Sequence, residues 1–146
     1  MVQERLKRLE DHIRSLEAFR RRYPREAIHA DEHLEWALRY GVLRAFQMII
    51  NIACHLASAR DLGSPATYSE CVDLLEKHGY LDADLAQRLR RMIGLRNILI
   101  HEYLRVDVHR LIDYLDHLDD FRTFVREVYP HLQGGVYERR PALLGR

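Results

Sequence analysis

Four polar side chains lie close together near residue 100. Arg96, Asn97, His101 and Tyr103 bring a guanidinium, an amide, an imidazole and a phenol within eight residues, and the positions between them are mostly aliphatic. A guanidinium holds a phosphodiester through several donors, and an imidazole moves protons near neutral pH. Aliphatic neighbours indicate a half-buried helix, in which such groups are costly unless they are used or paired. This segment is therefore the first candidate for a reactive site.

RNA cleavage is a reaction that these groups would support. RNA carries its own nucleophile, the 2′-hydroxyl, so cleavage needs a base for its proton, an acid for the leaving 5′-oxygen and positive charge beside the phosphorane. With an ordinary pKa of about 6.5, His101 would act as base or acid. Arg96 would stabilise the charged transition state. This chemistry requires no metal ion and no cofactor.

The spacing of the four residues fits one broad face of a helix. Arg96 and Tyr103, seven positions apart, lie almost in line, and Asn97 and His101 stack one turn apart. Arg96 and His101 are poorly aligned with each other on a straight helix. Two copies of the segment across a two-fold axis, the commonest oligomeric symmetry, would supply two histidines and two arginines. The spacing therefore favours a site shared by two subunits.

Periodic apolar residues predict the helices that must position this segment. They recur at spacings of three and four over residues 2–22, 26–60, 67–77, from 82 into the motif, and 107–129. Thr67 and Glu70 form a capping box, Asp82 is an N-cap and Gly79 suits the end of the third helix. No run alternates as a strand does. The sequence predicts an all-α, up-and-down bundle of four main helices plus a short helix.

Composition narrows the class of protein further. The 23 basic and 22 acidic residues give a net charge of +1, which argues against a broad nucleic-acid surface but not against a local basic cleft. Cys54 and Cys71 are expected to be small buried residues in a reducing cytosol. No signal peptide or membrane span is expected, so the protein should be cytoplasmic. Residues 1–130 should form one domain and residues 131–146 a loose tail.

The segment resembles the R-x4-H-x-Y signature of HEPN-domain ribonucleases, specifically the HepT-type toxins. Arg96, His101 and Tyr103 match it, and Asn97 directly follows the arginine. The resemblance extends to residues 49–56 and 63–70, in the order of the family, and it covers roughly residues 30–125. It implies a HEPN-like fold.

The resemblance also implies an activity and its control. It implies a homodimer with an RNA-cleaving cleft at the interface, acting without metal on mRNA or tRNA as the toxin of a type VII-like toxin–antitoxin pair. Arg96 and His101 would be catalytic and Asn97 supporting. The implied partner is an MntA-like nucleotidyltransferase antitoxin that transfers AMP to Tyr103, where a bulky anionic group would fill the cleft.

Structural roles are open for each of these residues. His101 could be bonded to a carbonyl, and Arg96 could pair with Glu102 or another carboxylate. Asn97 could orient His101 or only support packing, and Tyr103 could be an interface aromatic. Two other classes of function are a non-catalytic subunit that binds nucleotide or substrate for a nucleotidyltransferase, and a structural dimerisation bundle.

Several features outside the motif have two interpretations each. His29 and His33 have the spacing of zinc ligands on a helix, but no third ligand is evident, and a solvated face is favoured. Asn51 is interpreted as a core polar group bonded to a neighbouring helix rather than as part of a dimer cleft. The arginines at 20–25 and 88–91 are solvated helix faces or guides for an RNA backbone.

Overall fold

The computed structural model describes residues 2–102 and 106–138, which form seven helices and no strand. Four helices are long: α1 (Val2–Arg22), α3 (Glu32–Ala59), α5 (Ala83–His101) and α7 (Asp119–Glu138). Three are short: α2 (Arg25–Ala30), α4 (Tyr68–Lys77) and α6 (Val108–Leu115). The all-α class and the four main helices are confirmed.

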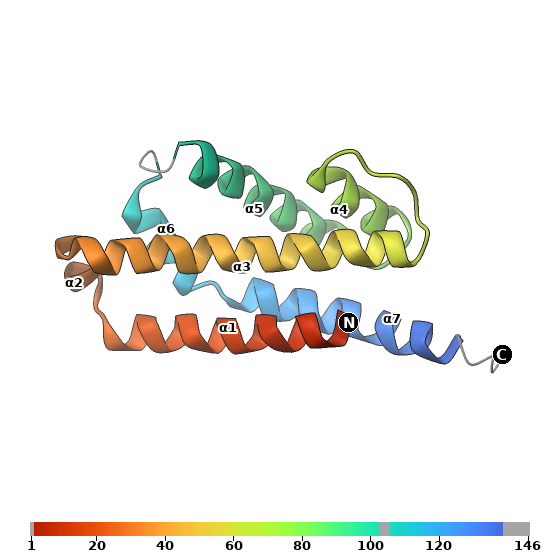
Figure 1. The fold of residues 1–146 in the computed structure, drawn as a ribbon, viewed down its shortest axis with the longest axis horizontal. Helices are drawn as coiled ribbons and strands as arrows, with labels where there is room; N and C mark the ends of the chain where they lie inside the picture. Colours follow the sequence, from red (N-terminus) through yellow and green to blue (C-terminus); the bar gives the residue numbers. More distant parts are fainter. Residues whose placement is uncertain (1, 103–105, 139–146) are drawn as a thin grey trace.

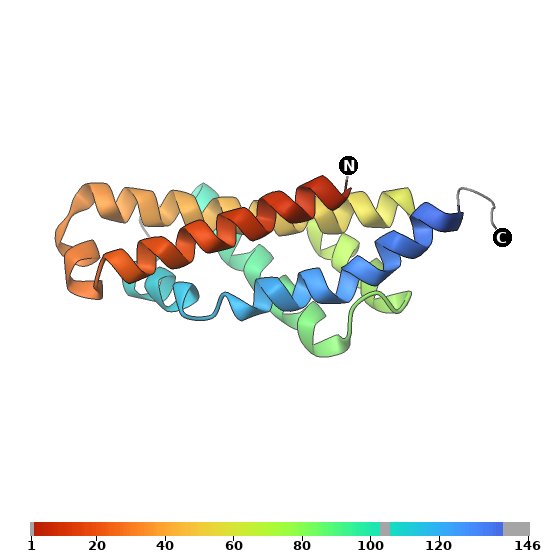
Figure 2. The ribbon, with the colours of Figure 1, turned by 90° about the horizontal axis from the view of Figure 1, so that it is seen from below.

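Helix α3 is the centre of the bundle, as its wide apolar face predicts. It packs against α1, α2, α4, α5 and α6. Figure 1 shows α1 and α7 on one side of α3 and α4 and α5 on the other, and Figure 2 shows α1 and α7 from below. Phe46 of α3 meets Phe121 of α7 and Tyr114 of α6 in the core, with ring centroids 6.1 and 5.1 Å apart.

Two predicted helices are each divided. The helix predicted over residues 26–60 breaks at Asp31, whose carboxylate accepts hydrogen bonds from the backbone N–H groups of His33 and Leu34, at 2.8 and 3.3 Å. This N-cap starts α3 and separates it from α2. The last predicted helix is also divided, between α6 and α7, and α7 runs through Pro130 to Glu138. The helix end expected before Pro130 is therefore wrong.

Local signals placed the ends of α4 correctly. The Thr67 hydroxyl accepts a hydrogen bond from the Glu70 N–H at 3.1 Å, and the Glu70 carboxylate accepts one from the Ala66 N–H at 2.6 Å. At the other end Gly79 has a φ of +82°, and the Tyr80 N–H donates to the Leu75 carbonyl at 2.8 Å. Glycine adopts this left-handed conformation without steric cost.

The sequence suggested that the two cysteines are small buried residues with reduced thiols, and this prediction is wrong. Cys54 of α3 and Cys71 of α4 form a disulfide, with Cα atoms 5.0 Å apart. The bond fixes the start of α4 to α3, close to the segment that carries the motif.

Among the described residues, α3 alone is long and apolar enough to cross a membrane by length and composition. Half of the apolar stretch of α3 is buried inside the bundle, as is typical of the core helix of a globular domain.

Candidate functional site

The motif from Arg96 to His101 forms the last turn and a half of α5. The Asp82 carboxylate caps the start of this helix by accepting from the Leu85 N–H at 2.8 Å. Leu95 and Leu99 are buried in the core and fix the rotation of the helix about its axis. Glu102 is the C-cap, and its N–H donates to the Ile98 carbonyl at 2.8 Å. The polar residues of the motif are therefore held on a rigid element near its end.

Arg96 is held by neutral groups of its own helix and of two other helices. Its Nε donates to the Gln47 side-chain oxygen of α3 at 3.0 Å, and its Nη1 donates to Oδ1 of Asn97 at 2.9 Å. Its guanidinium carbon lies 5.0 Å from the centre of the Tyr68 ring at the start of α4. These contacts orient the half-buried guanidinium, and none of them compensates its positive charge.

Other arginines of the chain are placed differently. Arg122 makes a two-pronged pair with Glu17, at 2.6 and 2.9 Å, and Arg88 and Arg90 each pair with two carboxylates. No carboxylate among residues 3–102 and 106–132 lies within ion-pair distance of Arg96, so the alternative of a pair with Glu102 does not occur. A charge that is oriented but not neutralised is suited to an external anion.

Asn97 and Asn51 differ from their expected contacts. Asn97 is exposed and bonds to Arg96 rather than to His101. Asn51 is also exposed, and it accepts a hydrogen bond from Nε2 of Gln47, one turn earlier on the same helix, at 2.8 Å. The interpretation of Asn51 as a core group bonded to a neighbouring helix is therefore wrong. Asn51 is hydrogen-bonded to Gln47, and Gln47 in turn accepts a hydrogen bond from Arg96.

His101 is the last residue of α5, and its side chain is exposed. It makes no hydrogen bond to any residue within the described ranges, so the alternative of an imidazole bonded to a carbonyl finds no partner there. Five helical positions separate it from Arg96 by about 7.5 Å along the axis and about 140° around it. The chain does not bring the two side chains together. Tyr103, the predicted acceptor of AMP, lies outside the described residues.

Gln47 and Tyr68 are site residues that the sequence did not reveal. Gln47 lies 49 positions before Arg96, and no local pattern links them. Two sequence features lie near these residues: Asn51, an amide four positions after Gln47, and the capping box that begins at Thr67, next to Tyr68. Both signals were visible, but neither indicated a contact with the motif.

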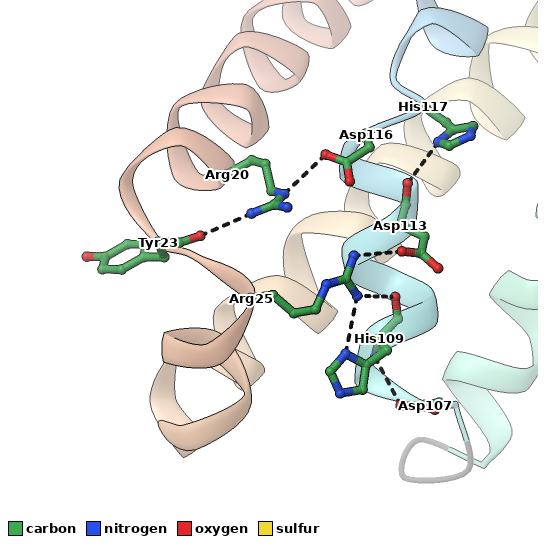
Figure 3. A network of polar contacts seen from close by, with 8 residues as sticks. All are labelled: Arg20, Tyr23, Arg25, Asp107, His109, Asp113, Asp116 and His117. Carbon is green, nitrogen blue, oxygen red and sulfur yellow. Dashed lines mark hydrogen bonds and ion pairs between the residues drawn. The ribbon is translucent and has the colours of Figure 1, made fainter.

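The other sequence candidates are explained by contacts within the bundle. Arg20 pairs with Asp116 at 3.1 Å and Arg25 with Asp113 at 2.8 Å, which ties α1 and α2 to α6 (Figure 3). The imidazole of His29 stacks on that of His109, with centroids 5.0 Å apart. His33 instead meets Trp36 edge-on.

Within the part of the chain that the structure describes, no group of three or more histidine, cysteine or acidic residues could hold a metal ion.

Known proteins are similar to this chain in sequence and in fold. A family model described as ribonuclease HepT-like matches residues 9–128. The mRNA nuclease HepT of Shewanella oneidensis is 30% identical over 96 residues, which are 65% of this chain and 72% of that protein.

Solved structures give the same picture of the fold. A tri-AMPylated Shewanella oneidensis HEPN toxin in complex with MNT antitoxin superposes with a TM-score of 0.78 at 22% identity, covering 88% of this chain and 96% of that chain. A cytosolic protein of unknown function, YutE from Bacillus subtilis, superposes with a TM-score of 0.70 at 17% identity, covering 88% and 91%.

Proposed function

The chain belongs to the HepT-like ribonuclease family, and we propose that it is a metal-independent RNA endonuclease, the toxin of a type VII-like toxin–antitoxin pair in the cytoplasm. The observation that carries this proposal is the state of Arg96, whose guanidinium is oriented by Gln47 and Asn97 and has no carboxylate partner among the side chains that the structure describes. A phosphodiester would supply the missing negative charge. His101, exposed and unbonded among the described residues, would handle the proton.

The proposed cleavage uses the nucleophile of the RNA itself. One histidine takes the proton of the 2′-hydroxyl, and the resulting oxygen attacks the adjacent phosphorus. A second histidine gives a proton to the departing 5′-oxygen, so that a 2′,3′-cyclic phosphate and a free 5′-hydroxyl are formed. Arg96 donates hydrogen bonds to the non-bridging oxygens, whose charge is largest at the phosphorane.

A homodimer would supply the second histidine. Large apolar side chains are exposed on α3 and near the end of α5: Trp36 is 50% exposed, Tyr40 60% and Ile100 44%. Trp36 and Tyr40 are one helical turn apart, so they lie on one stripe of α3. Aromatic residues of this kind are typical of interface centres. A two-fold axis close to the exposed end of α5 would bring two copies of His101 into one cleft.

An MntA-like nucleotidyltransferase antitoxin is the proposed partner, and Tyr103 the proposed site of AMP transfer. A similar HEPN toxin is AMPylated in its complex with an MNT antitoxin. Tyr103 follows His101 by two positions. An adenylate attached there would add a phosphate two positions beyond His101 in the chain, and this anion would compete with RNA for the proposed site.

The decisive experiment is incubation of purified protein with RNA, with and without chelator. We expect cleavage that resists chelator, is lost in Arg96→Ala and His101→Ala, and persists in Arg126→Ala and His78→Ala, which remove the same side-chain types from exposed positions elsewhere. No cleavage by the wild-type chain would refute the ribonuclease. Cleavage by both motif variants would refute the assigned residues.

Mixing the wild-type chain with an equal amount of the His101→Ala chain tests whether subunits share the site. If cleavage needs both copies of His101, only wild-type homodimers cleave RNA, and these are about a quarter of the dimers after random exchange. A site contained in one chain would keep about half of the activity of an all-wild-type sample. The wild-type chain mixed with itself is the control.

A further inference from the structure

A cavity of about 620 Å³ opens beside Arg96, between the α3–α4 connection, the start of α4 and α5. Figure 1 shows α4 and α5 side by side over the end of α3. The walls of the cavity include Tyr68, Ile93, Asn97 and the Cys54–Cys71 disulfide. The volume lies within the range of small-molecule sites, about 300–1,000 Å³. The cavity is therefore large enough for a nucleotide unit.

Its aromatic wall is accessible to a ligand. The Tyr68 side chain is 38% exposed although it stands against the bundle. Arg96 lies over the same ring, at 5.0 Å from its centre. A group that stacks on Tyr68 would thus be adjacent to whatever anion the guanidinium holds. Flat apolar surfaces with aromatic character are what a nucleobase requires for stacking.

Asn97 provides a polar group of defined direction at the same cavity. Its Oδ1 accepts from Arg96 at 2.9 Å, and because a guanidinium only donates, the amide orientation is fixed. The Nδ2 amino group has no acceptor among the described residues. It is left to donate to a group that enters from the cavity. Every nucleobase presents a carbonyl oxygen or ring nitrogen that would accept this bond.

We propose that this cavity binds a nucleobase of single-stranded RNA adjacent to the phosphate held by Arg96. Tyr68 stacks on the base, Asn97 donates a hydrogen bond to its edge, and the disulfide and Ile93 form the apolar floor. The inference rests on the proposed function, because Arg96 is taken as the phosphate-binding group. It adds a base-dependent component to binding, and it makes Tyr68 a residue that positions the substrate.

The test measures binding without cleavage. The first probe is a fluorescein-labelled, fully 2′-O-methylated oligonucleotide of eight mixed-sequence residues, which lacks the nucleophile. The second is an abasic sugar–phosphate chain of equal length and charge. Stacking of one base predicts that the wild-type chain prefers the first probe by on the order of 10-fold. The preference should survive in Tyr68→Phe, which keeps the ring, and fall to near unity in Tyr68→Leu.

The matched control is Tyr129→Leu, which removes another exposed tyrosine, 42% accessible, from α7. It should keep the full preference, and thermal melting of each variant shows that it is folded. Equal wild-type binding of both probes, or an unchanged preference in Tyr68→Leu, would overturn the inference, as would an equal loss in Tyr129→Leu.

The two proposals fail in different ways. RNA cleavage together with equal binding of both probes leaves the ribonuclease intact and removes the base site. Base-dependent binding that requires Tyr68, without any cleavage of RNA, supports the cavity and refutes the ribonuclease.

Discussion

Replacement of Gln47 by glutamate tests whether the uncompensated charge of Arg96 matters. The substitution puts a carboxylate where an amide oxygen now accepts from Nε at 3.0 Å. The side chain keeps its size and its place on α3, so the packing around Phe46 and Ile50 is unchanged. The changes are a negative charge next to the guanidinium and the loss of the Nε2 donor to Oδ1 of Asn51, a donor that the comparison variant Gln47→Met also loses. In the proposed ribonuclease this carboxylate would compete with the phosphate.

The size of the effect follows from the position of the pair. Two unit charges 4 Å apart attract by about 4 kcal/mol at an effective dielectric constant of 20. Exposed pairs reach only about 0.2–1 kcal/mol. Because Arg96 and Gln47 are both half-buried, an intermediate of about 1.5–2 kcal/mol is expected. If that attraction must be given up to bind the transition state, kcat/KM falls by about 10- to 30-fold.

The assay is steady-state cleavage of a labelled RNA, with two comparison variants. Gln47→Met removes the hydrogen bond without adding charge and should cost about 1 kcal/mol, or roughly five-fold, through lost orientation. Gln87→Glu adds the same charge to the exposed face of α5, where Gln87 contacts the already paired Arg90 at 3.3 Å. It should leave cleavage unchanged.

The order of the variants decides between charge and orientation. If Arg96 needed only to be held in place, glutamate would hold it at least as well as glutamine, and Gln47→Glu would be more active than Gln47→Met. A Gln47→Glu chain with wild-type kcat/KM would refute the argument that Arg96 acts through an uncompensated charge. A higher melting temperature together with weaker cleavage would support it.

Three further predictions concern stability. His12 donates from Nε2 to the Gly41 carbonyl at 2.8 Å, and burial lowers its pKa. The folded chain then binds a proton less readily than the unfolded chain, so this stabilisation is complete above the unfolded pKa of about 6.5 and is lost as the pH falls through the folded pKa. Urea unfolding at pH 7 and pH 5 should show a smaller acid loss in His12→Gln, and an equal loss would contradict the assignment. Cys54→Ser opens the bond to Cys71, which closes a loop of 17 residues, and should lower the free energy of unfolding of the oxidised protein by about 3 kcal/mol; a difference that persists in reductant would exclude the disulfide as its cause. Asp31→Ala should cost about 1 kcal/mol through the lost N-cap of α3, measured by thermal melting, whereas Asp31→Asn should keep most of it.

The helices that the sequence predicted well are those with local signals at their ends. The cap at Thr67, the left-handed Gly79 and the N-cap Asp82 act within a few residues, so their effect can be read without the fold. The break at Asp31 was missed because apolar periodicity continues from α2 into α3 across it. The extension of α7 past Pro130 was missed because a proline in a helix is a weakening, not an obligatory end.

The site was predictable only along one helix. The spacing of Arg96, Asn97 and His101 on α5 follows from helical geometry, and so does the poor alignment of arginine and histidine. The groups that orient Arg96 come from α3 and α4, and their approach depends on how the three helices pack. Gln47 and Tyr68 could not be assigned from a single sequence, because nothing local distinguishes them from other surface amides and tyrosines.

The distribution of charge explains how a nearly neutral chain would select RNA. Arg20, Arg25, Arg88 and Arg90 are each paired with carboxylates in the bundle, so the clusters they belong to do not form a continuous basic surface. Nucleic-acid affinity that comes from phosphates alone scales with the number of free cations that meet the backbone. Each of these pairs lowers that number, and Arg96 adds one oriented cation in each subunit. In the proposed ribonuclease, contacts to bases add to the affinity, and the cavity beside Tyr68 lies where such contacts would be adjacent to the phosphate.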